Sequence, residues 1–504
     1  MIQQLTPVLI IGIIVSYFLV LVAISYFTGK DAGNDNFFLA GRKSNWMLVA
    51  FGMVGATLSG VTFISIPGVV GAGGANQAFS YMQMVFGYFL GYMFIALVLM
   101  PLYYRLGLTS IYTYLDQRFG RNSYKTGAFY FLLSRVIGAS FRLYLVAIVL
   151  QQFVLAPFGV PFGVTVFSTI ALIWVYTFRG GINTIVWTDT LQTLSLLTAV
   201  VLTIFAIGQA LETDLGGLIT MVKNSDYSQM FFFEGGWSDP NNFFKQFIAG
   251  ALITIVMTGL DQDMMQKNLS CPNIRDAQKN MFTFSFILIF ANLIFLTLGA
   301  LLYIYASNVG IEIPEKTDLL FPQIALQHLS PSIGIVFIIG LIAAAYSSAD
   351  SALTSLTTSF CVDFLDFEKS DLPEDQQKKK RFQVHLGFSA LLFTLIMIFN
   401  AVNNEAVISQ LFKFAGYTYG PLLGLFAFGT MTKLQINDRW VIPICIAAPL
   451  VTILIDQYSA QILYGFEFGF LNLALNGLLT FLGLIAISYR TYETEEESIE
   501  VKEE

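Results

Sequence analysis

Apolar residues fall in long blocks separated by short polar stretches along the whole chain. A block of about 20 residues, at a helical rise of about 1.5 Å per residue, spans a hydrocarbon core of about 30 Å, so each block predicts a membrane-spanning helix. The blocks lie at residues 5–27, 46–73, 79–102, 126–155, 162–178, 184–209, 244–264, 281–306, 333–361, 383–400, 407–430, 440–457 and 464–489. The pattern therefore predicts an all-α membrane protein with about 13 transmembrane helices.

Composition supports this fold class and narrows the function. Of the 504 residues, 56% are hydrophobic and only 12% are charged, whereas ordinary globular chains are about 25% charged. Three scattered cysteines and two histidines argue against a disulfide framework, a zinc site or histidine-dependent catalysis, so we do not expect an enzyme. A net charge of -7 argues against nucleic acid as a partner, which leaves the lipid bilayer and small molecules. Nothing in the pattern requires an oligomer.

The basic residues predict how the chain is oriented. Cytoplasmic loops next to membrane spans are enriched in Lys and Arg. With the N-terminus outside the cell, alternate loops on one side collect 20 of the 26 basic residues, among them a loop with Lys267, Arg275 and Lys279. We therefore expect a multi-pass protein of the cell membrane, with an external N-terminus and a cytoplasmic C-terminus that carries the acidic tail 490–504.

A few charged residues lie inside the apolar blocks. These are Arg135, Arg142, Asp189, Asp350 and Lys413. A charge in a bilayer costs several kcal/mol, and where it occurs it usually faces a cavity or a partner. Lys413 lies near the external start of its block, so snorkelling toward the membrane surface is an alternative.

Two blocks are interrupted by residues that break helices. The second block carries glycines, including Gly55 and Gly60, together with Pro67, and the seventh ends in the polar segment 257–263. Discontinuous helices free backbone carbonyls for an ion or a substrate, although close packing of glycines is an equal alternative. Because the two blocks lie five helices apart, we predict two inverted five-helix repeats.

The predicted division of the chain follows from these repeats. The parts are a flanking helix and loop (1–45), a first repeat (46–210), an external segment that would act as a lid (211–243), a second repeat (244–430), two flanking helices (431–489) and the tail (490–504).

The ninth block contains a helix that is rich in hydroxyl groups. Ser347, Ser348, Asp350, Ser351 and Thr354 place hydroxyl and carboxylate oxygens within about two turns. Alkali cations prefer such oxygen ligands. A helix-packing face is the alternative, because Ser and Thr also join membrane helices to one another, but packing does not explain the carboxylate.

Four stretches of the sequence resemble the sodium/solute symporter family. They are Phe37-Phe-Leu-Ala-Gly-Arg42, Arg179-Gly-Gly-Ile-Asn-Thr-Ile-Val-Trp-Thr-Asp-Thr-Leu-Gln192, Asp261-Gln262 with Gln266-Lys-Asn-Leu-Ser270, and Ala343-Ala-Ala-Tyr-Ser-Ser348. The resemblance covers nearly the whole chain. It implies a leucine-transporter-like core of two inverted five-helix repeats with flanking helices, in agreement with the apolar pattern, and Na+ as the coupling ion.

The resemblance also implies sodium sites. A first site would use the carbonyls of Gly55, Leu58 and Ala344 with the hydroxyls of Ser347 and Ser348. Some members hold a second sodium near the aspartate that corresponds to Asp189, with serines of the hydroxyl-rich helix. Here a position that is serine in those members is Asp350, followed by Ser351, so a second sodium and a proton are both open at this site.

Arginine inside the membrane bears on the solute. Arg135 and Arg142 are seven residues apart on one predicted helix, and guanidinium groups pair with carboxylates through two hydrogen bonds. Neutralisation of buried aspartates is the alternative role. The lysine typical of the family's galactose transporters aligns with Leu288, which weakens a sugar assignment. The residues expected to contact the solute are Thr57, Thr62, Phe63, Gln83, Arg135, Arg142 and Lys413, with Tyr81, Phe86, Tyr417 and Tyr419 as further candidates for cavity walls.

These observations predict a sodium-coupled symporter that imports a small polar solute by alternating access. The arginines favour a solute that bears a carboxylate, such as a sugar acid, a sialic acid, a monocarboxylate or an amino acid. The alternatives are a sodium/sugar symporter, and a proton-coupled carrier that uses Asp350 and Asp189. A membrane sensor is disfavoured, because only about 15 residues follow the last apolar block.

Overall fold

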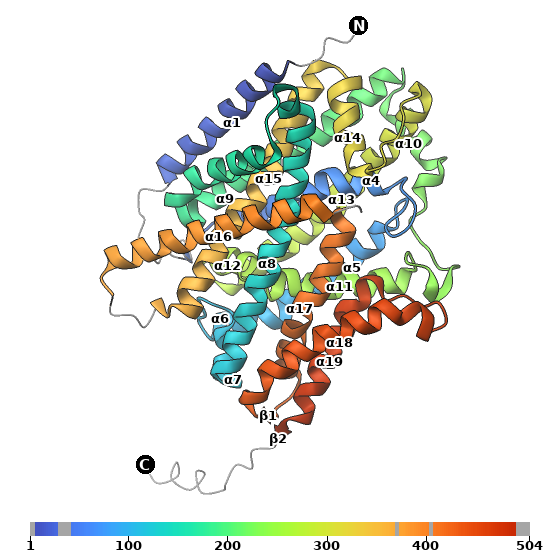
Figure 1. The fold of residues 1–504 in the computed structure, drawn as a ribbon. Helices are drawn as coiled ribbons and strands as arrows, with labels where there is room; N and C mark the ends of the chain where they lie inside the picture. Colours follow the sequence, from blue (N-terminus) through green and yellow to red (C-terminus); the bar gives the residue numbers. More distant parts are fainter. Residues whose placement is uncertain (1–5, 29–41, 368–371, 403–406, 490–504) are drawn as a thin grey trace, which may run out of the picture.

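The computed structural model describes residues 6–28, 42–367, 372–402 and 407–489, without the side chains of residues 7 and 176–183. The tail 490–504 and most of the Phe37–Arg42 motif therefore lie outside the described residues. Long helices packed side by side make up almost all of the described chain (Figure 1). This arrangement is expected in a bilayer, where an α-helix satisfies its own backbone hydrogen bonds.

The first half of the chain builds a flanking helix and then a bundle. The elements are α1 (Pro7–Thr28), α3 (Trp46–Thr57), α4 (Ile66–Val69), α5 (Tyr81–Phe94), α6 (Met100–Arg105), α7 (Thr113–Arg118), α8 (Arg121–Leu150), α9 (Phe162–Ala210) and α10 (Leu215–Lys223). Short π-helical turns at Val61–Ser65, Ile95–Leu99 and Gln151–Leu155 continue three of these helices.

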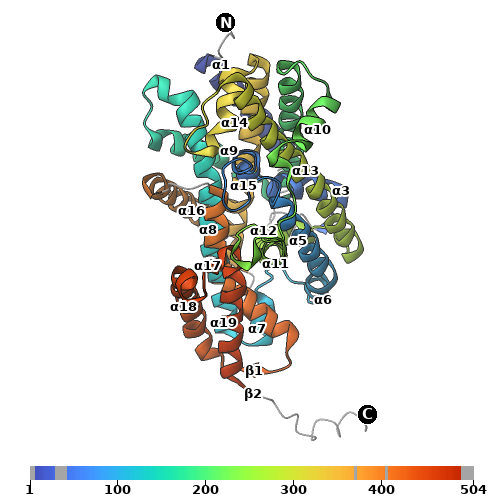
Figure 2. The same ribbon diagram turned by 90° about the vertical axis from the view of Figure 1, so that its right-hand side faces the viewer.

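The second half repeats the plan and adds two further helices. Its elements are α11 (Phe243–Thr254), α12 (Gln262–Leu269), α13 (Ile274–Val309), α14 (Leu320–Gln323), α15 (Pro331–Ser359), α16 (Glu374–Val402), α17 (Val407–Met431), α18 (Val441–Ile462) and α19 (Asn472–Ala486). The short strands β1 (Gln435–Ile436) and β2 (Ser488–Tyr489) pair antiparallel. The helices α18 and α19 pack beside α17, as the turned view shows (Figure 2).

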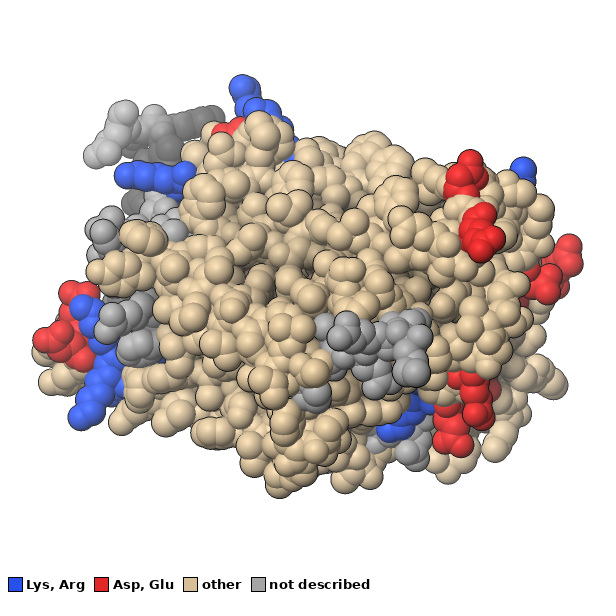
Figure 3. Space-filling model, turned by 90° about the horizontal axis from the view of Figure 1, so that it is seen from above, with Lys and Arg blue, Asp and Glu red and all other residues tan. Residues whose placement is uncertain are grey.

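The predicted spans correspond to helices. Within the described residues, nine helices are long and apolar enough to cross a membrane, and two bent helix pairs bring this number to 11. The shorter apolar helix Phe162–Val175 and α17 lie at the two remaining predicted spans. In Figure 3, uncharged residues cover the middle of the visible face and charged side chains gather toward its edges, as expected for a chain that spans a membrane.

One predicted boundary differs from the structure. The sequence predicts two spans, 162–178 and 184–209, whereas the backbone of α9 is helical without a break over 49 residues. Glycine in a helix interior costs only about 0.5–1 kcal/mol relative to alanine, so the glycine pair after Arg179 is too weak a signal to end a helix. The division into the predicted domains remains a prediction.

The centre of the molecule is built around α9. This helix packs against α1, α3 and α15, while α8 packs against both α15 and α17. The first helix after each predicted repeat boundary, α3 in one half and α11 in the other, is bent. These two bends form the site described next.

Candidate functional site

Two broken helices meet at the site. The helix α3 ends at Thr57, Leu58 leaves the helical conformation at φ -77° and ψ 66°, and the following helical segment, Val61–Val69, continues at an angle of 61°. In the second half, Phe243–Gly259 and Gln262–Leu269 are bent by 64°. Backbone groups at such helix ends lack partners within the helix. The predicted interruptions in the second and seventh blocks are therefore confirmed, and they lie in corresponding positions of the two halves.

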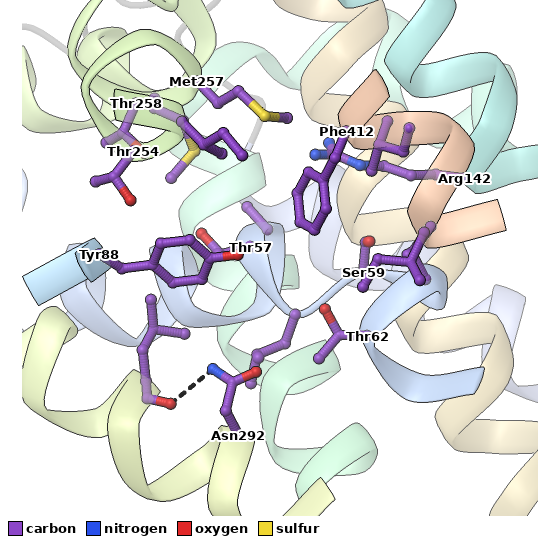
Figure 4. A pocket seen from close by; sticks show the side chains of 18 of the residues that line it. Thr57, Ser59, Thr62, Tyr88, Arg142, Thr254, Met257, Thr258, Asn292 and Phe412 are labelled. Atoms are coloured by element: carbon purple, nitrogen blue, oxygen red, sulfur yellow. Dashed lines mark hydrogen bonds between the residues drawn. The ribbon is translucent and has the colours of Figure 1, made fainter. Parts of the chain in front are cut away.

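A cavity of about 90 Å³ lies between the two breaks. Its walls come from α3, α5, α8, α11, α12, α13 and α17, with the π-helical turns at Val61–Ser65 and Ile255–Gly259. Figure 4 shows Thr57, Ser59 and Thr62 of the first break facing Thr254 and Thr258 of the second half, with Tyr88 and Phe412 between them. The walls combine hydroxyl groups with apolar and aromatic surface, which suits a small polar organic molecule.

Arg142 provides the charge in this cavity. It lies on α8, is only 8% exposed, and points into the cavity beside Phe412 (Figure 4). Its Nε and Nη1 atoms are buried and make no hydrogen bond with any described residue. An unpaired buried guanidinium is costly, because its hydration is lost and nothing replaces it. The position is therefore suited to an anionic ligand, and a carboxylate matches its planar donor geometry.

Arg135 has a different role. Its Nη2 donates to Asp263 Oδ2 and its Nη1 lies 3.9 Å from Asp261 Oδ2, while Asp261 also accepts a hydrogen bond of 2.7 Å from the Tyr419 hydroxyl. Asp261 caps α12 by accepting from the backbone N–H of Asp263 at 3.0 Å. Arg135 lines the cavity, but two aspartates of the second helix break neutralise it. The alternative role in charge neutralisation therefore holds for Arg135, with partners other than Asp189 and Asp350.

The predicted first sodium site lies where α3, α9 and α15 are in contact. Ser347 Oγ donates to Asp189 Oδ1 at 2.6 Å, and Ser348 Oγ donates to the carbonyl of Ala344 at 3.2 Å. Because a hydroxyl oxygen keeps two lone pairs when it donates its hydrogen, both oxygens remain able to bind a cation. Gly55 is required by packing, since a Cβ there would lie 2.2 Å from Thr193 Oγ1 on α9.

At the predicted second sodium site, one of the predicted ligands is paired with a cation of the protein. Asp189 Oδ2 forms an ion pair of 2.7 Å with Lys267 Nζ. The sequence places Lys267 in a cytoplasmic loop, and this placement is wrong, because the residue lies inside the fold on α12. Asp350 and Ser351 are fully buried on the same part of α15, and Ser351 Oγ makes no hydrogen bond with a described residue.

Three residues predicted to contact the solute lie elsewhere. Phe63 is fully buried among the rings of Phe295, Phe321 and Phe337, at centroid distances of 6.3, 5.1 and 5.5 Å. Gln83 donates to the carbonyl of Asn241 at 2.8 Å and accepts from the N–H of Phe232 at 3.1 Å, so it fastens the segment 211–243 to the start of α5. Lys413 is exposed and does not line the cavity.

The aromatic candidates divide in the same way. Tyr81 lines the cavity, shares a hydrogen bond of 2.9 Å with the hydroxyl of Tyr88, and stacks on Phe412 at a centroid distance of 6.5 Å. Phe86 instead stacks on Phe231, and Tyr417 donates to Asp456, so both lie outside this cavity.

Sequence reasoning missed part of the cavity wall. The missed residues that line it include Tyr88, Tyr92, Thr254, Thr258, Asn292 and Phe412. Each is an ordinary residue for a packed membrane helix, so no signal in one sequence marks it. Leu288, which stands in place of a lysine, does line the cavity and makes that wall apolar.

Comparison with known proteins identifies the family. The sodium:solute symporter family matches residues 37–438. A sodium/sialic acid symporter of Proteus mirabilis is 24% identical over 466 residues, which cover 90% of this chain and 91% of the relative. A sodium/sialic acid symporter of Aliivibrio fischeri is 25% identical over 433 residues, covering 81% and 80%.

A solved structure shows the same fold. A Na+-coupled sialic acid symporter in a substrate-bound outward-open state superposes with a TM-score of 0.81 at 20% identity, covering 96% of this chain and 99% of the other. The family match spans most of the chain and includes both broken helices. The chain therefore belongs to the sodium:solute symporter family and is a multi-pass, sodium-coupled membrane transporter.

Proposed function

We propose that this symporter imports a small solute that bears a carboxylate, and that Arg142 binds that carboxylate. The observation that carries the proposal is the buried guanidinium in the cavity, whose Nε and Nη1 have no partner among the described residues. The rest of the cavity offers hydroxyl groups and aromatic faces, which can bind the remainder of a sugar acid or a short monocarboxylate. Relatives of this chain are consistent with this class, since they include symporters of sialic acid and a sodium-coupled monocarboxylate transporter of Bos taurus.

In the proposed coupling, sodium binds at the break of the first broken helix. Sodium would bind between the carbonyls of Gly55 and Leu58 on one side and Ala344, Ser347 and Ser348 on the other. This site joins the broken helix to α15, and those two elements are in contact. Bound sodium then favours the conformation in which the broken helix and α15 are in contact, and the solute binds to the same conformation. Coupling of this kind requires only that each ligand prefer that state.

The direction of transport follows from the proposed orientation. The N-terminus lies outside the cell and the C-terminus inside, in the cell membrane, as the distribution of Lys and Arg indicates. Cells keep internal sodium low, so the concentration gradient makes sodium entry downhill even when sodium and the solute together carry no net charge. Solute bound together with sodium is therefore carried inward.

The test is a matrix of ligands and ions on the purified protein. Thermal stabilisation is measured for sialic acid, monocarboxylates, amino acids and neutral sugars, each in sodium chloride and in choline chloride at one ionic strength. Any ligand that stabilises is then compared with its own methyl ester, which keeps the shape and removes the charge. We expect stabilisation by one carboxylate class, in sodium only, and loss of stabilisation by the ester. Equal stabilisation by an ester or by a neutral sugar would refute the proposed substrate class, and equal stabilisation in choline would refute sodium coupling.

A further inference from the structure

A groove with mainly aromatic and aliphatic walls lies between the first part of α9 and α16, away from the solute cavity. Its volume is about 450 Å³. The helix α16 lies at the edge of the bundle (Figure 2), and it is long and apolar enough to cross a membrane. Phe167 of α9 and Leu386 of α16, which line the groove, are 66% and 53% exposed. The groove therefore opens at a surface that would face the bilayer.

The two helices are in contact at both ends of the groove. At one end, the rings of Trp174 and Phe382 meet edge to face at a centroid distance of 5.4 Å. At the other end, Met397 and Phe393 lie 3.7 and 3.9 Å from the position that a Cβ of Gly163 would take. Phe393 follows Phe382 by 11 residues, which is about 16 Å along a helix. This is about half of a hydrocarbon core of about 30 Å, so the groove has the depth of one leaflet.

Basic residues lie directly beyond the Phe382 end of the groove. Residues 378–381 read Lys-Lys-Lys-Arg and belong to the first turns of α16. Lys379 precedes Phe382 by three residues, so both lie on the same face of the helix. Lys379 and Lys380 are exposed and make no ion pair with any described residue. Two positive charges are therefore available at the level where the headgroup of a lipid would lie.

Acidic residues in the same turns do not cancel these charges. The stretch 374–381 contains Glu374 and Asp375 but four basic residues. Glu374 forms an ion pair of 3.1 Å with Lys378, one turn farther along the helix. The beginning of α16 therefore keeps an excess of positive charge beside the groove.

We propose that the groove binds an acyl chain of an anionic phospholipid and that Lys379 and Lys380 bind the phosphate of its headgroup. The depth of the groove fits a chain that reaches from the membrane surface to the midplane. Trp174 lies at the headgroup end, and tryptophan is enriched at membrane interfaces. Clusters of Lys and Arg beside a spanning helix attract anionic lipids. A neutral phospholipid fills the groove equally well but leaves both lysines without an anion, so the site selects the lipid by charge.

The site lies apart from the proposed solute and sodium sites. In the proposed orientation the basic end of α16 is cytoplasmic, so the lipid belongs to the cytoplasmic leaflet. Only the name of the leaflet rests on that orientation. The binding of the lipid depends on the groove and the lysines alone.

The test is native mass spectrometry of the purified full-length protein in an equal mixture of phosphatidylglycerol and phosphatidylcholine with the same acyl chains. Ala390→Phe adds a ring inside the groove from an exposed position, and the double variant Lys379→Gln with Lys380→Gln removes the charges. The controls are Ala447→Phe, at an exposed position of α18, and Lys433→Gln, at an exposed position outside the groove. Size-exclusion chromatography establishes that each variant is folded.

We expect the wild type and both controls to retain one phosphatidylglycerol molecule. Each lysine contributes about fivefold near an anionic lipid, so the preference over phosphatidylcholine should be about 30-fold. The double lysine variant should keep a bound lipid and lose the preference, and Ala390→Phe should lose the bound lipid.

Equal retention of the two lipids by the wild type would overturn the proposal. Wild-type retention of phosphatidylglycerol by Ala390→Phe would also overturn it, because the lipid would then lie outside the groove. An unchanged preference in the double lysine variant would overturn the role of the two lysines. No solute or sodium is present in the experiment, so none of these results depends on the proposed substrate or coupling ion.

Discussion

Arg142 gives the sharpest test of the substrate assignment. Replacing it with glutamine keeps a long polar side chain and removes the positive charge. Because Nε and Nη1 have no partner among the described residues, the substitution breaks no ion pair of the resting fold. We therefore expect folding and sodium binding to survive, with the loss confined to the solute.

The expected size of the effect follows from the geometry. A hydrogen bond to a charged group contributes about 1.5–3 kcal/mol, and more is lost if the partner is left buried and unpaired. Since each 1.4 kcal/mol is a factor of ten, the affinity for the solute should fall by about 10- to 150-fold in Arg142→Gln. Arg142→Lys keeps the charge but not the planar pair of donors, so its loss should be smaller.

The assay is sodium-driven uptake into proteoliposomes over a range of solute concentrations. Lys413→Gln is the control, since it removes a basic residue of α17 that is exposed and does not line the cavity. The apparent affinity should fall in both Arg142 variants and stay unchanged in the control. An Arg142→Gln protein that takes up the carboxylate with wild-type affinity would refute this role. A defect in Lys413→Gln would place the binding site outside this cavity, on the exposed face of α17.

Three further predictions concern the surroundings of the cavity. Arg135→Gln leaves Asp263 buried without its partner, which should lower the free energy of unfolding by about 3–5 kcal/mol; an unchanged melting temperature would contradict the pairing. Ser348→Ala removes a hydroxyl group of the proposed first sodium site and should weaken apparent sodium affinity by about tenfold or more, for the loss of at least 1.4 kcal/mol, with solute affinity restored at saturating sodium. Unaltered sodium dependence would exclude the site. Burial raises the pKa of Asp318, which lies in the segment between α13 and α15. A hydrogen bond of 3.1 Å from the Val407 N–H to its carboxylate opposes this rise only in part. The folded state then holds a proton that the unfolded state loses near pH 4, so stability falls as pH rises from there through the raised pKa, and Asp318→Asn should flatten that part of the profile of melting temperature against pH.

The fold could be predicted from the sequence because the bilayer allows few solutions. Apolar blocks of membrane length leave only helices, and Gly60 and Pro67 in one such block predict its interruption. The structure confirms a bend of 61° there and a matching bend of 64° in the second half. The boundary at Gly180 and Gly181 is different, because a glycine pair alone does not say whether a helix ends or continues.

The site could be predicted only in part, because burial inside a membrane protein depends on three-dimensional contacts. The sequence predicts that Arg142 faces a cavity or a partner, since a charge in an apolar helix needs a polar environment, and the structure places it in the cavity wall. Phe63 lies near a helix break in sequence but packs into an aromatic cluster. The sequence predicts a loop for Lys267 because it follows the seventh apolar block, and only the bend before α12 brings it back into the protein beside Asp189.

The charge carried in one cycle connects the solute and the ion count. One sodium ion and one monocarboxylate together carry no net charge, so a membrane potential should neither drive nor oppose their uptake. A second sodium would add one charge, worth about 2.3 kcal/mol for each 100 mV, or about a 50-fold change in accumulation. Proteoliposomes with valinomycin and a potassium gradient separate the two cases at a fixed sodium gradient. With the single proposed sodium site, wild-type accumulation should not respond to an inside-negative potential. A wild-type response of this size would refute either the single sodium ion or the single negative charge on the solute.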